Sequence, residues 1–144
     1  GASVFDALRW PYPGDQQVIV VHLITNDFLY GTSLVRYQQA LRQVLVDLRE
    51  RSPEANLICL GTWQRPGMVN RARVPLQSFD AAAREGCASE HGEFVPLDRI
   101  FATPGSRGPA GQDTPWGPTD GFHPNDVGAQ MIANAVLAEI PNGN

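Results

Sequence analysis

A continuous apolar run near the start of the chain constrains its fold more than any other feature. Residues 16–27 read QQVIVVHLITND, so the run ends in the polar pair Asn26–Asp27. A strand with one face in water alternates apolar and polar residues, whereas an uninterrupted apolar run is typical of a strand buried on both faces. Such strands occur in parallel sheets that carry helices on both faces. The sequence therefore predicts a parallel sheet that contains this strand.

Helical patterns alternate with further short apolar runs along the chain. Residues 32–53 place their apolar side chains on one helical face. Thr32 or Ser33 is expected to cap this helix, and Pro53 prevents its continuation. The other expected elements are strands at 55–63 and 93–98, a helix at 74–92 with Pro75 in its first turn, a Pro/Gly-rich loop at 102–119 and a final helix at 125–140. The final helix is expected to bury Val127, Met131, Ile132, Ala135 and Val136.

This order of elements predicts the fold class. Strands that alternate with helices at this spacing form βαβ units with right-handed crossovers, and 144 residues fit a single α/β domain over 1–144. Ligands of such sheets bind beyond the carboxyl ends of the strands. The segments expected there are Asn26–Asp27, the loop 61–74 and the loop that carries Asp120 and His123.

The charge pattern argues against several classes of partner. The formal net charge is −4 and no run of like charges occurs, so neither a nucleic-acid footprint nor a polybasic membrane patch is expected. No apolar stretch approaches the roughly 20 residues of a membrane span. Because the chain opens without a starting Met, the lack of a signal peptide leaves the compartment open, and secreted and cytoplasmic locations both fit.

The cysteines and histidines match no metal motif, and no metal site is expected. Cys59 and Cys87 lack both metal-ligand and CxxC spacing. Two buried free thiols are expected in preference to a disulfide, which stays open as the alternative. His22, His91 and His123 show no zinc-ligand spacing. His22 lies within the first expected strand and is predicted to be a buried histidine.

Asp120 and His123 are the strongest candidates for catalytic residues. They stand three apart on a loop directly before the last helix. At this spacing the carboxylate reaches the imidazole Nδ1–H and leaves Nε2 facing a cleft, as in the acid and base of a hydrolytic triad. The alternative is a helix N-cap at Asn125 that is preceded by incidental polar residues.

Asn26 is the third candidate. An asparagine at the carboxyl end of a buried strand is placed to direct its side-chain NH₂ at a developing oxyanion. We expect this side chain in the same cleft as His123, with Asp27 bracing the turn. Taken alone, an Asn–Asp pair after a strand is more often turn chemistry.

Two blocks together, VIVVHLITNDF at 18–28 and DGFHPN at 120–125, resemble the SGNH (GDSL-type) hydrolase family. The resemblance implies a flavodoxin-like three-layer α/β/α sandwich with a parallel sheet. It also implies that Asp120 and His123 belong to a Ser-His-Asp triad and that Asn26 donates to the oxyanion. It covers the chain from the family's second or third block to the C-terminus.

The chain departs from the family pattern in two places. Ile24 stands where the third block of the family has glycine, and no Gly-Asp-Ser block occurs. Gly1 stands at about the right distance to be the oxyanion glycine of the second block and is a tentative candidate for that role. The N-terminal strands of the family fold are therefore expected to be missing from this chain.

The resemblance implies an ester hydrolase that acts by serine acyl transfer, of the lipase, esterase or carbohydrate acetylesterase type, with no cofactor. Its substrate would be an ester of a short acyl chain, a lipid or an acetylated sugar. The serines are Ser3, Ser33, Ser52, Ser78, Ser89 and Ser106. None lies in a strand-to-helix elbow, so the nucleophile is expected on a segment outside this sequence. The alternative is a non-catalytic pseudo-hydrolase or binding module of the same fold.

Two further expectations concern the surroundings of the site. Trp63, Trp116 and Phe122 lie on loops at the site end of the sheet, where they either line an acyl or sugar pocket or cover the core. No Gly-rich phosphate loop follows any strand, which argues against a nucleotide binder.

The absent Gly-Asp-Ser block has a consequence for the sheet. In a flavodoxin-like strand order, 2-1-3-4-5, the strand at 18–23 pairs with the absent first strand. Without that partner it presents unpaired backbone groups at a sheet edge that has neither charges nor proline to protect it. We expect a preceding segment or a companion chain to supply the missing strand; a second copy pairing edge to edge is the weaker alternative.

Overall fold

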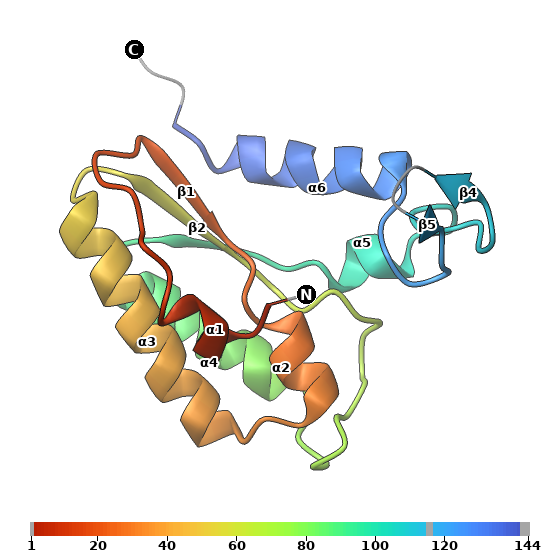
Figure 1. Ribbon diagram of the computed structural model, residues 1–144, viewed down its shortest axis with the longest axis horizontal. Helices are drawn as coiled ribbons and strands as arrows, with labels where there is room; N and C mark the ends of the chain where they lie inside the picture. The colour runs from red at the N-terminus through yellow and green to blue at the C-terminus, as the bar shows by residue number, and fades with distance from the viewer. Residues whose placement is uncertain (1, 115–116, 142–144) are drawn as a thin grey trace.

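The computed structural model describes residues 2–114 and 117–141 (Figure 1). Its elements in chain order are α1 (Val4–Ala7), β1 (Val18–Val21), α2 (Thr25–Tyr30), α3 (Leu34–Arg51), β2 (Asn56–Leu60), α4 (Leu76–Ser89), β3 (Glu93–Val95), α5 (Asp98–Ala102), β4 (Asp113–Thr114), β5 (Gly117–Pro118) and α6 (Asp126–Ala138). No helix among the described residues is long and apolar enough to cross a membrane.

The central sheet is parallel and has the order β1-β2-β3. Val20 pairs with Ile58 across the first ladder, and Cys59 pairs with Phe94 across the second. Helices α3 and α4 pack on one face of the sheet and α6 on the other, which gives three layers (Figure 1). The predicted α/β class with a parallel sheet is confirmed.

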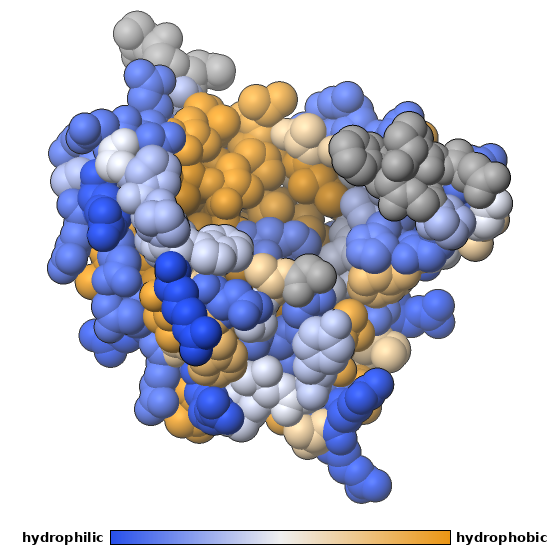
Figure 2. Space-filling view, in the orientation of Figure 1, coloured by the Kyte–Doolittle hydropathy of each residue, from blue (hydrophilic) through white to orange (hydrophobic). Residues whose placement is uncertain are grey.

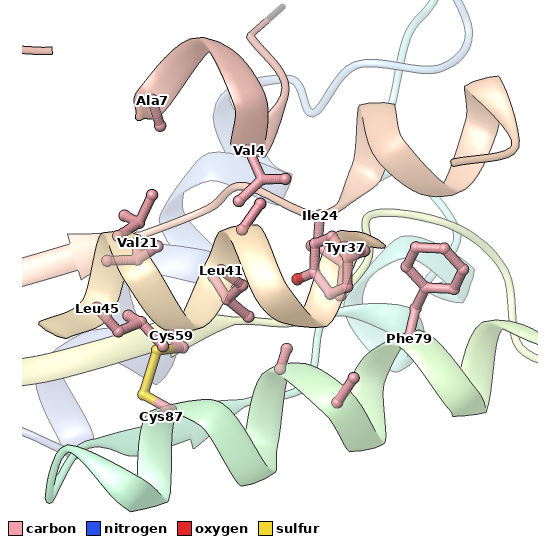
Figure 3. Close-up of a cluster of buried hydrophobic side chains, with 14 of the residues drawn as sticks. Val4, Ala7, Val21, Ile24, Tyr37, Leu41, Leu45, Cys59, Phe79 and Cys87 are labelled. Carbon is pink, nitrogen blue, oxygen red and sulfur yellow. A yellow bond between two sulfur atoms is a disulfide. The ribbon is translucent and has the colours of Figure 1, made fainter. Parts of the chain in front are cut away.

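The larger core lies between the sheet and helices α1, α3 and α4 (Figure 3). Helix α3 buries Tyr37, Leu41, Val44, Leu45 and Leu48, which share one face at helical spacing as predicted. The ring of Phe79 in α4 lies 5.0 Å from that of Tyr37 and 5.6 Å from that of Phe28, measured between centroids. These aromatic contacts join α2, α3 and α4 below the sheet.

A smaller core lies on the opposite face of the sheet. Ile58, Leu60 and Val95 from the strands meet Trp63 and Phe101 there. Helix α6 covers this cluster with partly buried side chains, which include Ile132, Ala135 and Val136. The prediction that Val127 is buried is wrong, because 56% of its surface is exposed and it is not part of this cluster.

The capping signals are largely confirmed. Ser33 caps α3 through its Oγ, which accepts the N–H of Arg36 at 3.4 Å. Asn125 caps α6. Pro75 was expected in the first turn of α4. It is the N-cap residue, which lies just before that turn. Strand β3 is shorter than predicted because Pro96 has no N–H with which to extend the ladder.

Strand β1 differs most from its prediction. The sequence predicts a strand buried on both faces, yet Val18 is 37% exposed and Val20 is 47% exposed. Ile19 and Val21 pack into the larger core. The exposed valines lie on the α6 side of the sheet, because Val20 stands beside Ile58 of the smaller core. The expected burial therefore holds for only one face of β1.

The two cysteines form a disulfide between β2 and α4 (Figure 3). The expectation of two free thiols is wrong. Cys59 points from β2 toward the larger core, and Cys87 lies on the buried stripe of α4 that faces it. The two cysteines face each other only because the fold packs α4 against β2. Their spacing in the sequence does not reveal this.

We predict that thiol titration in denaturant finds no free thiol before reduction. The bond joins residues 28 apart in the chain. In the chain-entropy account, breaking a cross-link of this separation lowers the free energy of unfolding by roughly 3–4 kcal/mol. Urea unfolding with and without reductant measures this loss. A C59S/C87S double variant should unfold at the same urea concentration in both conditions, whereas free thiols in protein isolated without reductant would contradict the disulfide.

Candidate active site

The loop before α6 holds Asp120 and His123 in the geometry that their spacing predicts. Nδ1 of His123 lies 2.7 Å from Oδ2 of Asp120, which confirms the expected hydrogen bond. The other carboxylate oxygen accepts the backbone N–H groups of Phe122 at 2.9 Å and of His123 at 2.7 Å. One carboxylate thus fixes both the turn and the imidazole. The His123 side chain is 76% exposed, so Nε2 is accessible.

The same hydrogen bonds determine the charge of Asp120. The backbone N–H of His123, then its imidazole, then the N–H of Phe122 lower the pKa of the Asp120 carboxyl to about 2. The carboxylate is therefore ionised throughout the pH range in which histidine titrates. An anion beside Nδ1 holds the proton on that nitrogen and leaves Nε2 as the basic atom.

Three side chains outside the loop hold it in place. Nε1 of Trp63, which is 3% exposed, donates to the carbonyl of Phe122 at 2.7 Å. The guanidinium of Arg107 lies over the Phe101 ring and donates to the carbonyl of Gly121 at 3.0 Å. Arg107 and Phe101 were not singled out in the sequence, because nothing in their spacing links them to the Asp120 loop.

Close packing at the start of α6 fixes the exit of the loop. The Asn125 side chain accepts the N–H of Gly128 at 3.1 Å and donates to the carbonyl of Gly108 at 2.8 Å. A Cβ added at Gly128 would collide with the Ser106 carbonyl oxygen. Glycine is therefore required where α6 meets the preceding loop.

Asn26 lies in the first turn of α2, which three residues separate from the end of β1. Its Nδ2 donates to the carbonyl of Ala2 at 2.7 Å. Asp27 is buried and accepts the N–H of Val4 at 2.8 Å and the hydroxyl of Thr32 at 3.0 Å. Burial raises the pKa of the Asp27 carboxyl, and these hydrogen bonds partly offset the effect. The Asn–Asp pair thus fixes the N-terminal segment beside the site, and Gly1 itself lies outside the described residues.

One cavity of about 760 Å³ joins these parts. Asn26 and His123 both line it, as expected, together with Thr25 and Trp63. Its other walls come mainly from apolar side chains of β1 and the N-terminal segment, and Figure 2 shows an apolar hollow on this face of the molecule. The cavity is thus polar at the carboxyl end of β1 and apolar along the strand.

His22 also lines this cavity, and the prediction that it is buried within a strand is wrong. The strand ends at Val21, so His22 turns outward, and its Nε2 lies 3.1 Å from the Thr25 hydroxyl. The neighbouring cavity walls displace water from part of its imidazole and so lower the pKa of that group, and a hydrogen bond with the Gly61 backbone partly offsets this.

Thr25 was not singled out in the sequence, although it precedes the Asn–Asp pair. Its hydroxyl accepts the backbone N–H of Trp63 at 2.9 Å. Trp63 therefore bonds the start of α2 through its backbone and the Asp120 loop through its indole. Of the aromatic residues expected at this end, Trp63 and Phe122 line the cavity and also pack in the smaller core. Trp116 lies outside the described residues.

All six serines lie within the described residues, and none of them lines the cavity. Ser3 and Ser33 cap helices. Ser52 and Ser106 are buried, and their hydroxyl groups form hydrogen bonds with backbone groups. The described residues therefore place an oriented imidazole and an asparagine amide at the cavity, but they place no serine hydroxyl beside them.

We predict that the Asp120 carboxyl titrates with a midpoint near 2. A folded-state pKa below the unfolded value, about 3.9, means that Asp120 stabilises the fold above that pH. This stabilisation is lost as the pH falls from about 4 toward 2. Carboxyl carbon NMR shifts measure the midpoint, and D120N identifies the signal. A midpoint at the ordinary value in the native protein would contradict the three hydrogen bonds.

We predict that W63F lowers the free energy of unfolding by about 1–3 kcal/mol, because the partly buried Phe122 carbonyl loses its donor. Urea unfolding measures the loss. W10F is the matched control, since Trp10 is 46% exposed and a surface change of this kind shifts stability by about 0.5 kcal/mol or less. Equal stability of the two variants would mean that the indole hydrogen bond does not hold the loop.

A search of curated proteins found no match. Twelve chains of solved structures resemble this chain, among them the following three. A protein from Lactobacillus plantarum is 20% identical, with a TM-score of 0.71 over 92% of this chain and 70% of that one. A possible lipase from Chitinophaga pinensis is 18% identical, with a TM-score of 0.67 over 94% of this chain and 76% of that one. A family two carbohydrate esterase from Clostridium thermocellum is 23% identical, with a TM-score of 0.56 over 89% of this chain and 35% of that one.

These likenesses show a shared fold. The sequence itself matches the model of the GDSL-like lipase/acylhydrolase family over residues 3–131. This match includes the Asn26–Asp27 pair and the loop with Asp120 and His123. Because it spans most of the 144 residues, the chain belongs to the GDSL-like lipase/acylhydrolase family.

Proposed function

We propose that this member of an acylhydrolase family hydrolyses carboxylic esters by serine acyl transfer. The hydrogen bond between Asp120 and His123, with Nε2 accessible at a cavity that Asn26 also lines, is the observation that carries the proposal. Membership in the family supports a hydrolase of this general class. We further propose that the serine nucleophile lies on a segment outside this sequence.

In the proposed reaction, His123 is first a base and then an acid. Its Nε2 takes the proton of the serine hydroxyl as the oxygen attacks the carbonyl carbon of the ester. The tetrahedral intermediate collapses, the bond to the alcohol oxygen breaks, and the same proton passes to that oxygen. Water then repeats the two steps on the acyl-enzyme and releases the acid. Asp120 stays ionised and orients the imidazole.

Asn26 is the proposed donor to the oxyanion. Its Nδ2 carries two N–H groups, and one of them is used in the hydrogen bond to Ala2. The second is free to meet the negative oxygen that forms in the transition state. The hydrogen bonds to Ala2 and Val4 also hold the N-terminal backbone beside Asn26. Gly1, which precedes this backbone in the sequence, is proposed as a second donor.

The proposed substrate is a carboxylic ester, either a simple acyl ester, a lipid or an acetylated sugar. The similar folds include a possible lipase and a carbohydrate esterase, and these names support a lipid ester and a carbohydrate ester as the two candidates.

A fluorophosphonate probe tests the enzyme directly on protein purified from its natural source. We predict that it labels a serine outside residues 1–144 and that H123N slows labelling by more than about 100-fold, since the base is lost. H91N is the matched control, because His91 lies in an exposed turn after α4 with a φ of 55°, which asparagine tolerates. Its labelling should equal that of the wild type.

Two other outcomes would contradict the proposal. Absence of labelling in the folded natural protein would favour a non-catalytic binding module of the same fold. Labelling of one of the six serines of this chain would show that the nucleophile was assigned to the wrong segment.

We predict that N26A lowers kcat by roughly 10²–10³ in the active protein, as expected for the loss of an oxyanion donor. Its stability should fall by only about 1 kcal/mol, because the hydrogen bond to Ala2 is lost. N134A, on the exposed side of α6, is the control and should leave kcat unchanged. Ester hydrolysis and urea unfolding measure the two effects. An unchanged kcat in N26A would restrict Asn26 to a structural role.

A further inference from the structure

We propose that a second cavity, between the end of α2 and the loop that joins β2 to α4, binds a small aromatic carboxylate (Figure 1). Its volume is about 390 Å³, within the range of about 300–1,000 Å³ that is usual for small-molecule sites. Among the described residues it shares no lining residue with the cavity at His123. The second site is therefore independent of the ester hydrolysis proposed above.

Asn70 brings to this cavity a hydrogen-bond donor that has no partner in the fold. Asn70 is 7% exposed and belongs to the cavity lining. Its Oδ1 accepts the backbone N–H groups of Ala72 and Val74, each at 2.9 Å, which fixes the orientation of the amide. Its Nδ2 is buried and has no hydrogen-bond partner among the described residues. Because a buried donor without a partner is costly, an acceptor oxygen of a ligand is stabilising at this point.

The ligand oxygen has to approach Nδ2 from the cavity. The Oδ1 of Asn70 faces the backbone of residues 72–74, so Nδ2 points away from that backbone. Neighbouring atoms cover Nδ2 in this structure. Met68 also lies in the lining, and its unbranched side chain adapts readily to a changed environment. We expect a ligand to displace the Met68 side chain and to reach the amide.

Arg71 adds a positive charge to the same lining. Its side chain is exposed, and among the described residues no carboxylate forms a salt bridge with it. Residues 28–46 and 55–79, which include the whole lining, contain five arginines and no Asp or Glu. The surroundings of the cavity are thus basic, although the chain has a net charge of −4. A guanidinium and an amide N–H group together favour a carboxylate, which accepts hydrogen bonds from both.

The rest of the lining favours an aromatic ring beside that carboxylate. Tyr30 is 70% exposed, Phe28 is buried, and both contribute to the lining together with Met68. Aromatic rings pack favourably on one another and on the sulfur of methionine. An inorganic anion offers no apolar surface to these side chains, and a neutral aromatic compound offers no charge to Arg71. An aromatic carboxylate matches both parts of the cavity.

Benzoate is the probe, and protein with its full natural sequence is titrated with it while NMR follows the side-chain amide signals. We expect the Asn70 NH₂ signals to shift on binding. N70D should weaken binding by about 10-fold or more, because aspartate keeps the acceptor for Ala72 and Val74 but has no N–H to donate. R71Q should also weaken binding by about 10-fold or more, because the charge is lost.

R42Q is the matched control for the loss of one positive charge. Arg42 is exposed on α3 and lines neither cavity, so benzoate should bind R42Q as it binds the wild type. Benzyl alcohol has the ring without the charge and should bind the wild type about 10-fold more weakly than benzoate, or less. H123N should bind benzoate as the wild type does.

Three results would overturn the proposal. The first is failure of benzoate to bind the wild type or to shift the Asn70 signals. The second is equal binding by R71Q and R42Q, a comparison of two exposed side chains that holds whether or not N70D folds. The third is weaker binding by H123N with unshifted Asn70 signals, because benzoate would then occupy the cavity at His123. Binding is read without ester hydrolysis, so its outcome is separate from that of fluorophosphonate labelling.

Discussion

The parallel pairing of the three central strands is the constraint on which the rest of the molecule depends. Parallel strands end at the same edge of a sheet, so the segments after β1 and β2 meet even though a long helix separates them in the chain. This brings Thr25, which follows β1, within 2.9 Å of the backbone of Trp63, which follows β2. The Asp120 loop then joins this edge through the indole of Trp63. Trp63 thus connects the amide and imidazole sides of the cavity.

Asp120 organises the site at a shorter range. One of its oxygens holds the turn through two backbone N–H groups, and the other holds the imidazole of His123. The same bonds lower the pKa of the carboxyl, so local folding and charge have one cause. The loop needs no buried charge to achieve this, because Asp120 and His123 remain exposed. In the proposed mechanism this exposure leaves Nε2 open to whatever hydroxyl enters the cavity.

Sequence patterns predicted the features that depend on local chemistry. Helical periodicity located α3 and α4, and the three-residue spacing predicted the hydrogen bond between Asp120 and His123. Features that depend on long-range packing were missed. The Cys59–Cys87 disulfide arises because β2 and α4 face each other, and the roles of Thr25 and Arg107 arise from loops that are distant in the chain. The apolar run of β1 predicted burial on both faces, and in the structure only one of its faces is buried.

The wrong prediction that β1 is buried on both faces and the lack of a serine at the site both concern the cavity that β1 and His123 line. The strand has the composition of an interior strand, yet its outer edge lies open along the cavity that ends at His123. None of the six serines of the chain lines this cavity. A wrong expectation from the composition of β1 accounts for the open edge. It does not account for the His123 imidazole, which is oriented but has no serine beside it. The serine that we propose on a segment outside this sequence has to enter the cavity at its polar end, where Nε2 of His123 is accessible. The open edge and the accessible imidazole thus belong to one cavity, and the proposed mechanism requires a hydroxyl from outside this sequence at its polar end.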